Sequence, residues 1–126
     1  MKKINLAISG CMGRMGQQLI RSSKKNRDFK LVSLTENRLI NKKIAGLKPS
    51  KNSIEAFKKS SVIIDFTVPK CTLEILKIAS KLKKRVVIGT TGFSKKEENL
   101  IKKPFLTQKK LILILFVKVM LLANMR

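Results

Sequence analysis

Apolar runs typical of strands alternate with amphipathic stretches along this chain. The apolar runs lie at 4–8, 29–34, 62–67 and 85–88. The stretches that follow them carry apolar residues at helical spacing, and the clearest is 72–82. One face of that stretch bears Ile75, Leu76, Ala79 and Leu82, and lysines occupy the other. The pattern therefore predicts strands that alternate with helices.

This alternation, with short connecting loops, predicts an α/β fold: a Rossmann-like parallel sheet with right-handed crossovers and helices on both faces. The run 62–67 is apolar apart from Asp65 and its last threonine, as expected of a strand buried on both faces. Pro69 is expected to stop strand pairing. Ser94 and Glu97 predict a capping box at the start of a further helix. A length of 126 residues suits a single domain.

A glycine-rich turn follows the first apolar run. Gly10, Gly13 and Gly16 lie at three-residue spacing directly behind residues 4–8. In a dinucleotide-binding turn the first glycine allows a tight bend, the second lets backbone amides approach a pyrophosphate, and the third lets the helix pack closely. The helix N-terminus then faces the phosphates with unpaired N–H groups. The context favours this role over an ordinary structural turn.

A carboxylate follows the second apolar run. Glu36 lies twenty positions after Gly16, where a dinucleotide-binding fold places the group that accepts hydrogen bonds from the adenosine ribose. The alternative is a solvated surface glutamate behind a structural turn. The spacing favours the ribose-binding role.

Loops at the carboxyl ends of parallel strands form one rim, where ligands bind. Phe66 and Thr67 are expected to line the cofactor path there, and residues 89–92 offer backbone amides and two hydroxyls. For those two threonines a plain strand-ending turn is the alternative. Asp65 is expected to be a buried carboxylate satisfied by backbone amides, or else a group that orients a loop.

The charge of the chain changes this picture little. The chain carries 29 Lys and Arg against 7 Asp and Glu, a net charge of +22, and such a charge attracts polyanions. However, lysine pairs are spread over the whole chain, and Trp and Tyr are absent as base-stacking platforms. The distribution favours a compositional drift toward Lys, Ile and Asn over a specific nucleic-acid surface.

The cysteines and the N-terminus indicate the compartment. Cys11 and Cys71 fit no metal spacing and no disulfide framework, and the N-terminus lacks the apolar segment of a signal peptide. The apolar run near the C-terminus is interrupted by Lys118 and is too short for a membrane span. We therefore expect a cytoplasmic protein with no metal and no membrane partner.

Three segments, in this order, resemble those of the 4-hydroxy-tetrahydrodipicolinate reductase family, also called dihydrodipicolinate reductase. They are the turn 10–16, which looks like the family's Gly-x-x-Gly-Arg-Met-Gly loop, the segment 64–69, and the segment 87–93 with Gly-Thr-Thr-Gly-Phe. The resemblance spans about residues 1–103. It implies an NAD(P)H-dependent reductase of the diaminopimelate route to lysine.

The resemblance also implies contacts with the cofactor. Gly13, Arg14 and Met15 would contact its diphosphate, and Glu36 its adenosine ribose.

Further along the cofactor, the resemblance assigns Phe66 and Thr67 to the middle of the molecule. Gly89 and Thr91 would lie at the nicotinamide end, and Thr91 would also contact the substrate.

The choice between NADH and NADPH is left open by the segment after the second apolar run. The family often has an arginine directly after the acidic residue, whereas this chain has Asn37 there and Arg38 one position further. Glu36 favours the free ribose of NADH, and Arg38 could tolerate the phosphate of NADPH. We expect use of both.

The family's chemistry is hydride transfer to a cyclic imine-type dicarboxylate, with a histidine as proton donor in a second domain that also forms the homotetramer. This chain contains no histidine. We expect residues 1–103 to form the dinucleotide-binding domain, with the second domain absent and 104–126 an aberrant apolar tail in which 111–117 could add a fifth strand. The chain would then be a truncated or frame-disrupted reductase that binds cofactor without turnover.

Two other functions remain open. A non-catalytic nucleotide-binding module fits the missing histidine, and a different Rossmann-type dehydrogenase of amino-acid metabolism could share the glycine turn. A nucleic-acid binder fits the charge alone.

Overall fold

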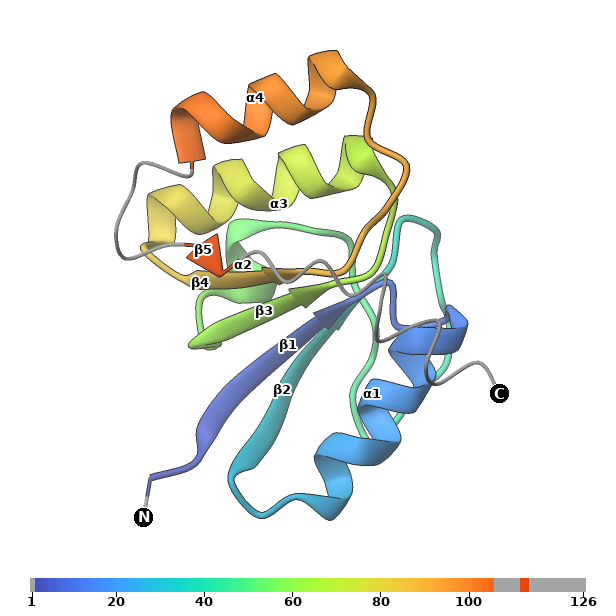
Figure 1. The fold of residues 1–126 in the computed structure, drawn as a ribbon. Coiled ribbons are helices and arrows are strands. Elements are labelled where there is room, and N and C mark those ends of the chain that lie inside the picture. The colour runs from blue at the N-terminus through green and yellow to red at the C-terminus, as the bar shows by residue number, and fades with distance from the viewer. Residues whose placement is uncertain (1, 106–111, 114–126) are drawn as a thin grey trace.

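The chain folds into a parallel sheet with helices on both faces (Figure 1). The computed structural model describes residues 2–105 and 112–113, with side chains described up to residue 101. The strands are β1 (Ile4–Ser9), β2 (Phe29–Thr35), β3 (Val62–Asp65), β4 (Arg85–Ile88) and β5 (Ile112–Leu113). The helices are α1 (Arg14–Lys25), α2 (Ile54–Phe57), α3 (Pro69–Leu82) and α4 (Lys95–Phe105).

The strand order creates a crevice at one edge of the sheet. The order is β2-β1-β3-β4-β5, and all four neighbouring pairs are parallel. From β1 the chain moves outward to β2 and then returns to β3 on the other side of β1. At such a switch point the helices that follow β1 and β3 lie on opposite faces of the sheet, and a ligand-binding crevice forms at the carboxyl ends of the strands. The predicted Rossmann-like fold is confirmed.

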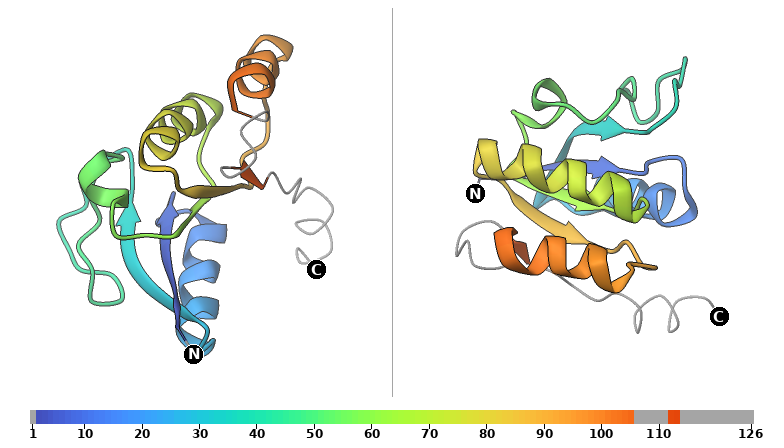
Figure 2. Two further views of the ribbon diagram at one scale, coloured as in Figure 1. Left: turned by 90° about the vertical axis from the view of Figure 1, so that its left-hand side faces the viewer. Right: turned by 90° about the horizontal axis from the view of Figure 1, so that it is seen from above.

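Alternate residues of the central strands feed two separate apolar cores. Ala7 of β1 and Ile63 of β3 pack in a core with α2, α3 and α4, while Ile8 and Ile64 from the same strands face the core under α1. The views in Figure 2 show α1 on the opposite side of the sheet from α3 and α4. The apolar run 62–67 is therefore explained by burial on both faces.

The boundary between β3 and α3 differs from the expectation. The strand ends at Asp65 rather than at residue 67, and the helix begins at Pro69 instead of Thr72. Proline suits the first turn of a helix, where its missing N–H group has no intrahelical partner to lose and its φ is already helical. Pro69 therefore both stops the strand and starts the helix.

Two serine caps set the starts of the helices flanking the sheet. The Ser53 hydroxyl accepts the Ala56 N–H at 3.0 Å, which begins α2. At α4 the predicted capping box is confirmed: the Ser94 N–H donates to Glu97 at 2.9 Å, and the Glu97 N–H donates to the Ser94 hydroxyl at 3.1 Å.

The predicted fifth strand is described in part. Ile112 and Leu113 pair with Val86 and Val87 of β4. The rest of 111–117 lies outside the described residues, and the proposed domain boundary at 103 stays a prediction. Within the part of the chain that the structure describes, no helix is long and apolar enough to cross a membrane.

Phe57 offers a test of the core under α2 and α3. Its side chain is fully buried, with 0% exposure. Phe57→Ala should lower the free energy of unfolding by about 3–5 kcal/mol, because it removes buried area and leaves a cavity. Urea denaturation measures this, with Leu39→Ala, 82% exposed, as the matched control that should change little. Equal stabilities of the two variants would contradict the assigned core.

Candidate functional site

The turn after β1 is bent tightly against the loop after β3. Gly10 has a φ of +83°, and a Cβ added to it would lie 2.3 Å from the Phe66 carbonyl oxygen. Any side chain at this position would therefore clash with backbone as well as adopt an unfavourable φ. The Gly10 N–H donates to the Thr35 carbonyl at 3.0 Å, which also joins the turn to the end of β2.

The other two glycines of the turn have different surroundings. A Cβ on Gly16 would lie 2.1 Å from the Gly10 carbonyl oxygen, so this glycine lets α1 pack against the turn. A Cβ on Gly13 would meet only the Gly10 oxygen, at 3.5 Å. Gly13 is also the N-cap of α1 and makes no side-chain capping bond. The geometry thus confirms the expected packing roles of the first and third glycines and leaves an accessible surface at the second.

Glu36 points into this turn. One carboxylate oxygen accepts the Met12 N–H at 3.0 Å, and the other accepts the Asn37 N–H at 3.2 Å. The Glu36 side chain is only partly exposed. A carboxylate bonded to the glycine turn lies at the switch crevice, so the alternative of a freely solvated surface glutamate does not describe it.

Asp65 organises the floor of the crevice. It is 0% exposed, and its two carboxylate oxygens accept hydrogen bonds from the hydroxyls of Thr67 and Thr72. Burial raises its pKa above the ordinary value of 3.8, and the hydrogen bonds from threonine hydroxyls oppose that rise. The sequence left two roles open for Asp65: a carboxylate satisfied by backbone amides, or a group that orients a loop. The hydroxyls of Thr67 and Thr72 tie the β3–α3 loop to the first turn of α3, so Asp65 both is satisfied and orients the loop.

The loop after β4 closes against the same floor. The Thr90 hydroxyl accepts the Thr67 N–H at 3.0 Å, and Thr90 is buried whereas Thr91 is exposed. Gly89 lies beneath the Phe66 ring, because a Cβ on Gly89 would lie 2.3 Å from that ring. Phe66 therefore packs over the end of β4, and Thr90 rather than Thr91 makes the contact with Thr67.

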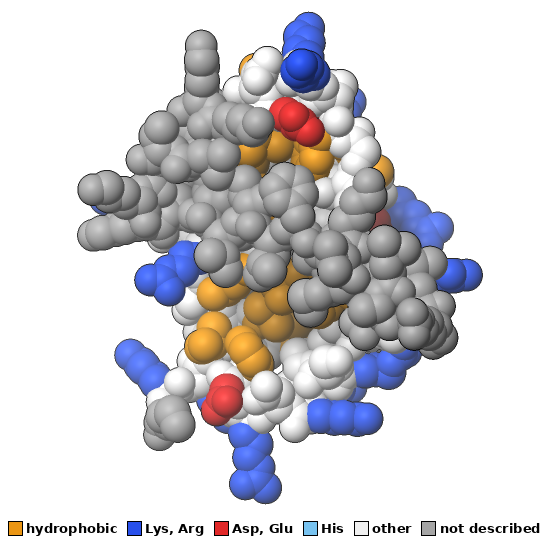
Figure 3. All heavy atoms as spheres, in the orientation of Figure 1, with side chains coloured by type: hydrophobic (Ala, Val, Ile, Leu, Met, Phe, Trp, Pro, Cys, Tyr) orange, Lys and Arg blue, Asp and Glu red, His pale blue; other side chains and the backbone are white. Residues whose placement is uncertain are grey.

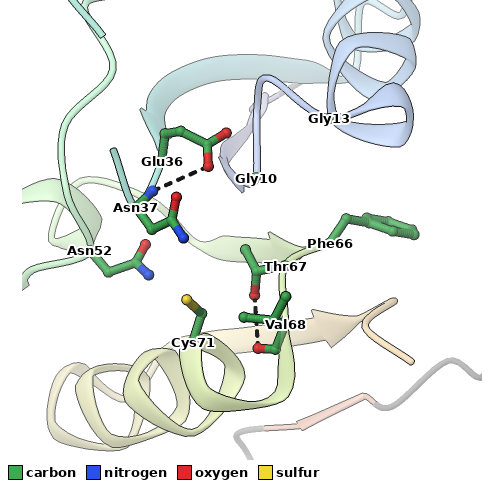
Figure 4. A pocket seen from close by; sticks show the side chains of 9 residues that line it. All are labelled: Gly10, Gly13, Glu36, Asn37, Asn52, Phe66, Thr67, Val68 and Cys71. Atoms are coloured by element: carbon green, nitrogen blue, oxygen red, sulfur yellow. Dashed lines mark hydrogen bonds between the residues drawn. The ribbon is translucent and has the colours of Figure 1, made fainter. Parts of the chain in front are cut away.

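A pocket opens between these loops, and Figure 4 shows the side chains around it. Its lining includes five of the residues expected from the sequence: Gly10, Gly13, Glu36, Phe66 and Thr67. It also includes four residues that were not assigned a role from the sequence: Asn37, Asn52, Val68 and Cys71. Asn37 and Val68 lie in the loops after β2 and β3, at the rim where the sequence predicted ligand binding. Asn52 and Cys71 carry no motif.

The remaining expected site residues lie around or away from this pocket. Arg14, Met15 and Gly16 form the first turn of α1, directly behind Gly13. Gly89 contacts the pocket residue Phe66 from below. Arg38 lines a separate shallow depression with residues 39–42, and Thr91 is exposed and is not part of the pocket lining.

The charge of the pocket is opposite to that of the chain. Among the described residues that line the pocket, Glu36 is the only charged side chain, and none is Lys or Arg. In Figure 3 the Lys and Arg side chains project around the periphery of the visible face. Within the described part of the chain, no group of three or more His, Cys, Asp or Glu side chains could hold a metal ion.

A parallel sheet whose first strand runs through a glycine turn into a helix, with a carboxylate held against that turn at the switch point, defines a dinucleotide-binding α/β domain. The chain belongs to the dihydrodipicolinate reductase family, since the family model described as "Dihydrodipicolinate reductase, N-terminus" matches residues 4–124. The resemblance of the turn 10–16 and the segments 64–69 and 87–93 to this family is thereby confirmed.

Relatives in this family share extensive sequence with the chain. It is 76% identical over 103 residues to the 4-hydroxy-tetrahydrodipicolinate reductase of Pelagibacter ubique, covering 82% of this chain and 40% of that protein. It is 40% identical over 102 residues to the enzyme of the same name from Bdellovibrio bacteriovorus, and the match covers 81% of this chain and 40% of that protein. The chain thus spans about 40% of the length of these relatives and corresponds to their N-terminal part.

Solved structures agree with the fold. The dipicolinate-bound dihydrodipicolinate reductase from Paenisporosarcina sp. TG-14 superposes with a TM-score of 0.63 at 27% identity, covering 77% of this chain and 41% of that one. The scyllo-inositol dehydrogenase from Lactobacillus casei, solved with bound NAD(H), has a TM-score of 0.72 at 16% identity, with 94% and 38% covered. The second likeness shows the fold alone.

The buried Asp65 predicts a specific pH dependence of stability. Its pKa is higher in the folded than in the unfolded chain, so its contribution is most favourable below about pH 3.8 and is lost as the pH rises through the folded-state pKa. Asp65→Asn removes this ionisation. Urea denaturation at each pH gives the free energy of unfolding of the parent chain and of the variant. The parent value minus the variant value should fall with rising pH and then level off. A difference that rises with pH would contradict the assignment.

Proposed function

We propose that this chain binds a nicotinamide adenine dinucleotide at the switch crevice and presents it for the reduction that gives its family its name. The observation that carries this proposal is the hydrogen bond from the Met12 N–H to the Glu36 carboxylate. It brings the end of β2 and the glycine turn to one site, as a ligand with a ribose next to a pyrophosphate requires.

The residues around the turn fit the diphosphate. Gly13 leaves open space at the start of α1, and the first turn of α1 contains no acidic residue. Backbone N–H groups at a helix N-terminus, with their partial positive charge, bind phosphate oxygens. We therefore assign the diphosphate to Gly13, Arg14 and Met15, while Gly10 and Gly16 shape the turn.

The crevice would hold the rest of the cofactor along the carboxyl ends of the strands. Glu36 would accept hydrogen bonds from the adenosine ribose. Phe66 and Thr67 would contact the middle of the molecule. Gly89 and Thr91 would lie toward the nicotinamide, and Thr91, being exposed, is available to a substrate.

The geometry supports NADH as the preferred cofactor. A phosphate on the ribose 2′ position would lie near the Glu36 carboxylate, which repels it, and none of the described residues that line the pocket is a cation. Arg38, the cation expected to accept such a phosphate, lines a different depression. Among the described residues, the pocket is therefore better matched to a ribose with a free 2′-hydroxyl, and NADPH would bind second.

In the family's reaction, this chain would contribute the binding of the cofactor and not the binding of the substrate. A bound nicotinamide supplies a hydride, and the names of the relatives indicate 4-hydroxy-tetrahydrodipicolinate, a small cyclic dicarboxylate, as its acceptor. These 126 residues contain no histidine, and they match about 40% of each relative. We infer that the substrate clamp and proton donor belong to the part of the family beyond the matched segment, so the chain alone binds cofactor without turnover.

Replacement of Glu36 tests the ribose assignment and the cofactor preference together. Gln can still accept the Met12 N–H, but it offers the ribose hydroxyls one acceptor fewer and loses the charge. Glu36→Gln should weaken NADH binding about tenfold, equivalent to about 1.4 kcal/mol, and should weaken NADPH binding less. Calorimetric titration measures both affinities. The control is Glu55→Gln, which removes an exposed carboxylate paired with Lys58 on α2. Equal affinities for the two variants would refute the role of Glu36.

Cysteine alkylation provides an independent test of where the cofactor binds. Cys71 lines the pocket and is partly exposed, while Cys11 is fully buried, and burial raises the pKa of Cys11 to about 11. Iodoacetamide at pH 8 should therefore modify Cys71 first, because the thiolate is the reactive form and must be accessible.

Saturating NADH should slow the modification of Cys71, followed by mass spectrometry of peptides. Tripolyphosphate should protect it less, since that anion can occupy the diphosphate position beside Gly13 but has no nucleoside to fill the rest of the pocket. Modification at an unchanged rate in NADH would place the cofactor elsewhere.

A further inference from the structure

Asn52 is held at the pocket by two buried hydroxyls. Its side-chain carbonyl oxygen accepts hydrogen bonds from the Ser9 hydroxyl at 3.0 Å and from the Thr35 hydroxyl at 2.6 Å. Ser9 and Thr35 are the last residues of β1 and β2, and they are 1% and 0% exposed. The loop that leads from β2 to α2 is thus anchored through Asn52 to the two strands that carry the glycine turn and Glu36.

This anchoring orients the other half of the amide. Because the carbonyl oxygen is occupied by the two hydroxyls, the amide nitrogen points the opposite way, and Figure 4 shows it directed toward the space between Asn37 and Cys71. Among the described residues, the structure gives this nitrogen no hydrogen-bond partner in the protein. Asn52 therefore presents two N–H donors to whatever fills the pocket.

The surroundings of Asn52 restrict the chemistry of that ligand. Val68 and Cys71 contribute apolar surface to the same pocket, and Glu36 supplies acceptors on its rim. A donor beside an apolar wall suits a flat apolar group with acceptors on its edge. A purine base has this character, since its ring nitrogens accept hydrogen bonds and its faces are apolar.

We propose that Asn52 recognises the adenine base of the dinucleotide by donating a hydrogen bond to one of its ring nitrogens. The assignment rests on the proposed function and extends it from the ribose and diphosphate to the base. Asn52 is a binding residue in this assignment, and Ser9 and Thr35 position it.

An isosteric substitution tests this assignment. In Asn52→Asp the carboxylate can still accept from Ser9 and Thr35, but the donors that face the pocket are lost. Asn41→Asp is the matched control, since Asn41 is exposed in the same loop and outside this pocket, and it makes the same change of charge. The probes are ADP-ribose, which contains adenine, and reduced nicotinamide mononucleotide, which lacks it, titrated by calorimetry into the full chain.

Asn52→Asp should bind ADP-ribose about tenfold more weakly than Asn41→Asp does, because one hydrogen bond is lost and a repulsive acceptor replaces it. Both variants should bind reduced nicotinamide mononucleotide alike. Thr35→Val, which removes one of the two hydroxyls that orient the amide, should cause a smaller loss for ADP-ribose alone. If Asn52→Asp does not fold, as judged by the loss of a cooperative unfolding transition, Thr35→Val tests the role of Asn52 in its place.

Three results would overturn the assignment. Equal binding of ADP-ribose by Asn52→Asp and Asn41→Asp, with the parent chain binding at one site, would reject the role of Asn52 and leave the proposed function standing. A parallel loss of both probes would show that Asn52 acts on the fold as a whole. The absence of saturable binding of NADH and ADP-ribose by the parent chain would reject the proposed function and this assignment together.

Discussion

The close approach of the Gly10 backbone to the Phe66 carbonyl is the constraint on which the site depends. A Cβ at Gly10 would lie 2.3 Å from that oxygen, so the turn after β1 and the loop after β3 can meet only if residue 10 lacks a side chain. Their contact sets the direction in which the chain enters α1, and the same turn places the Met12 N–H at the Glu36 carboxylate. A single steric limit at the switch point therefore determines where the helix N-terminus, the Glu36 carboxylate and the floor of the pocket lie relative to one another.

A second constraint fixes the loops at the carboxyl ends of β3 and β4 relative to each other. Burying a carboxylate is unfavourable unless hydrogen bonds replace its water, and Asp65 satisfies this requirement with the hydroxyls of Thr67 and Thr72. The Thr67 N–H in turn donates to Thr90 beyond β4. The desolvated carboxylate thus links the ends of β3 and β4 to the start of α3. The hydrogen bonds that satisfy one buried carboxylate therefore tie together the loops behind the pocket.

Most of the fold followed from the sequence because it depends on local patterns. The apolar runs predicted four strands, the three glycines predicted the turn after β1, and the spacing to Glu36 predicted which carboxylate would lie beside it. The parts that were missed depend on contacts between segments distant in the chain. Asn52 lies in a loop without periodicity, and its place at the pocket comes from hydroxyls at residues 9 and 35. Likewise, whether Thr90 or Thr91 faces Thr67 depends on how the chain leaves β4, which the dipeptide itself does not specify.

The contrast between the charge of the chain and the charge of the pocket explains why composition is a poor guide to function here. A net charge of +22 attracts any polyanion, and in salt this attraction decays within about 8–10 Å. It can raise the local concentration of a phosphorylated ligand, but it cannot distinguish a dinucleotide from an oligonucleotide. Discrimination must come from groups in contact with the ligand, and those that line the pocket are glycine backbone, amides, hydroxyls, apolar side chains and one carboxylate. A carboxylate in such a site opposes the long-range field, so contacts inside the pocket, and not the net charge, must decide which phosphorylated ligand is accepted.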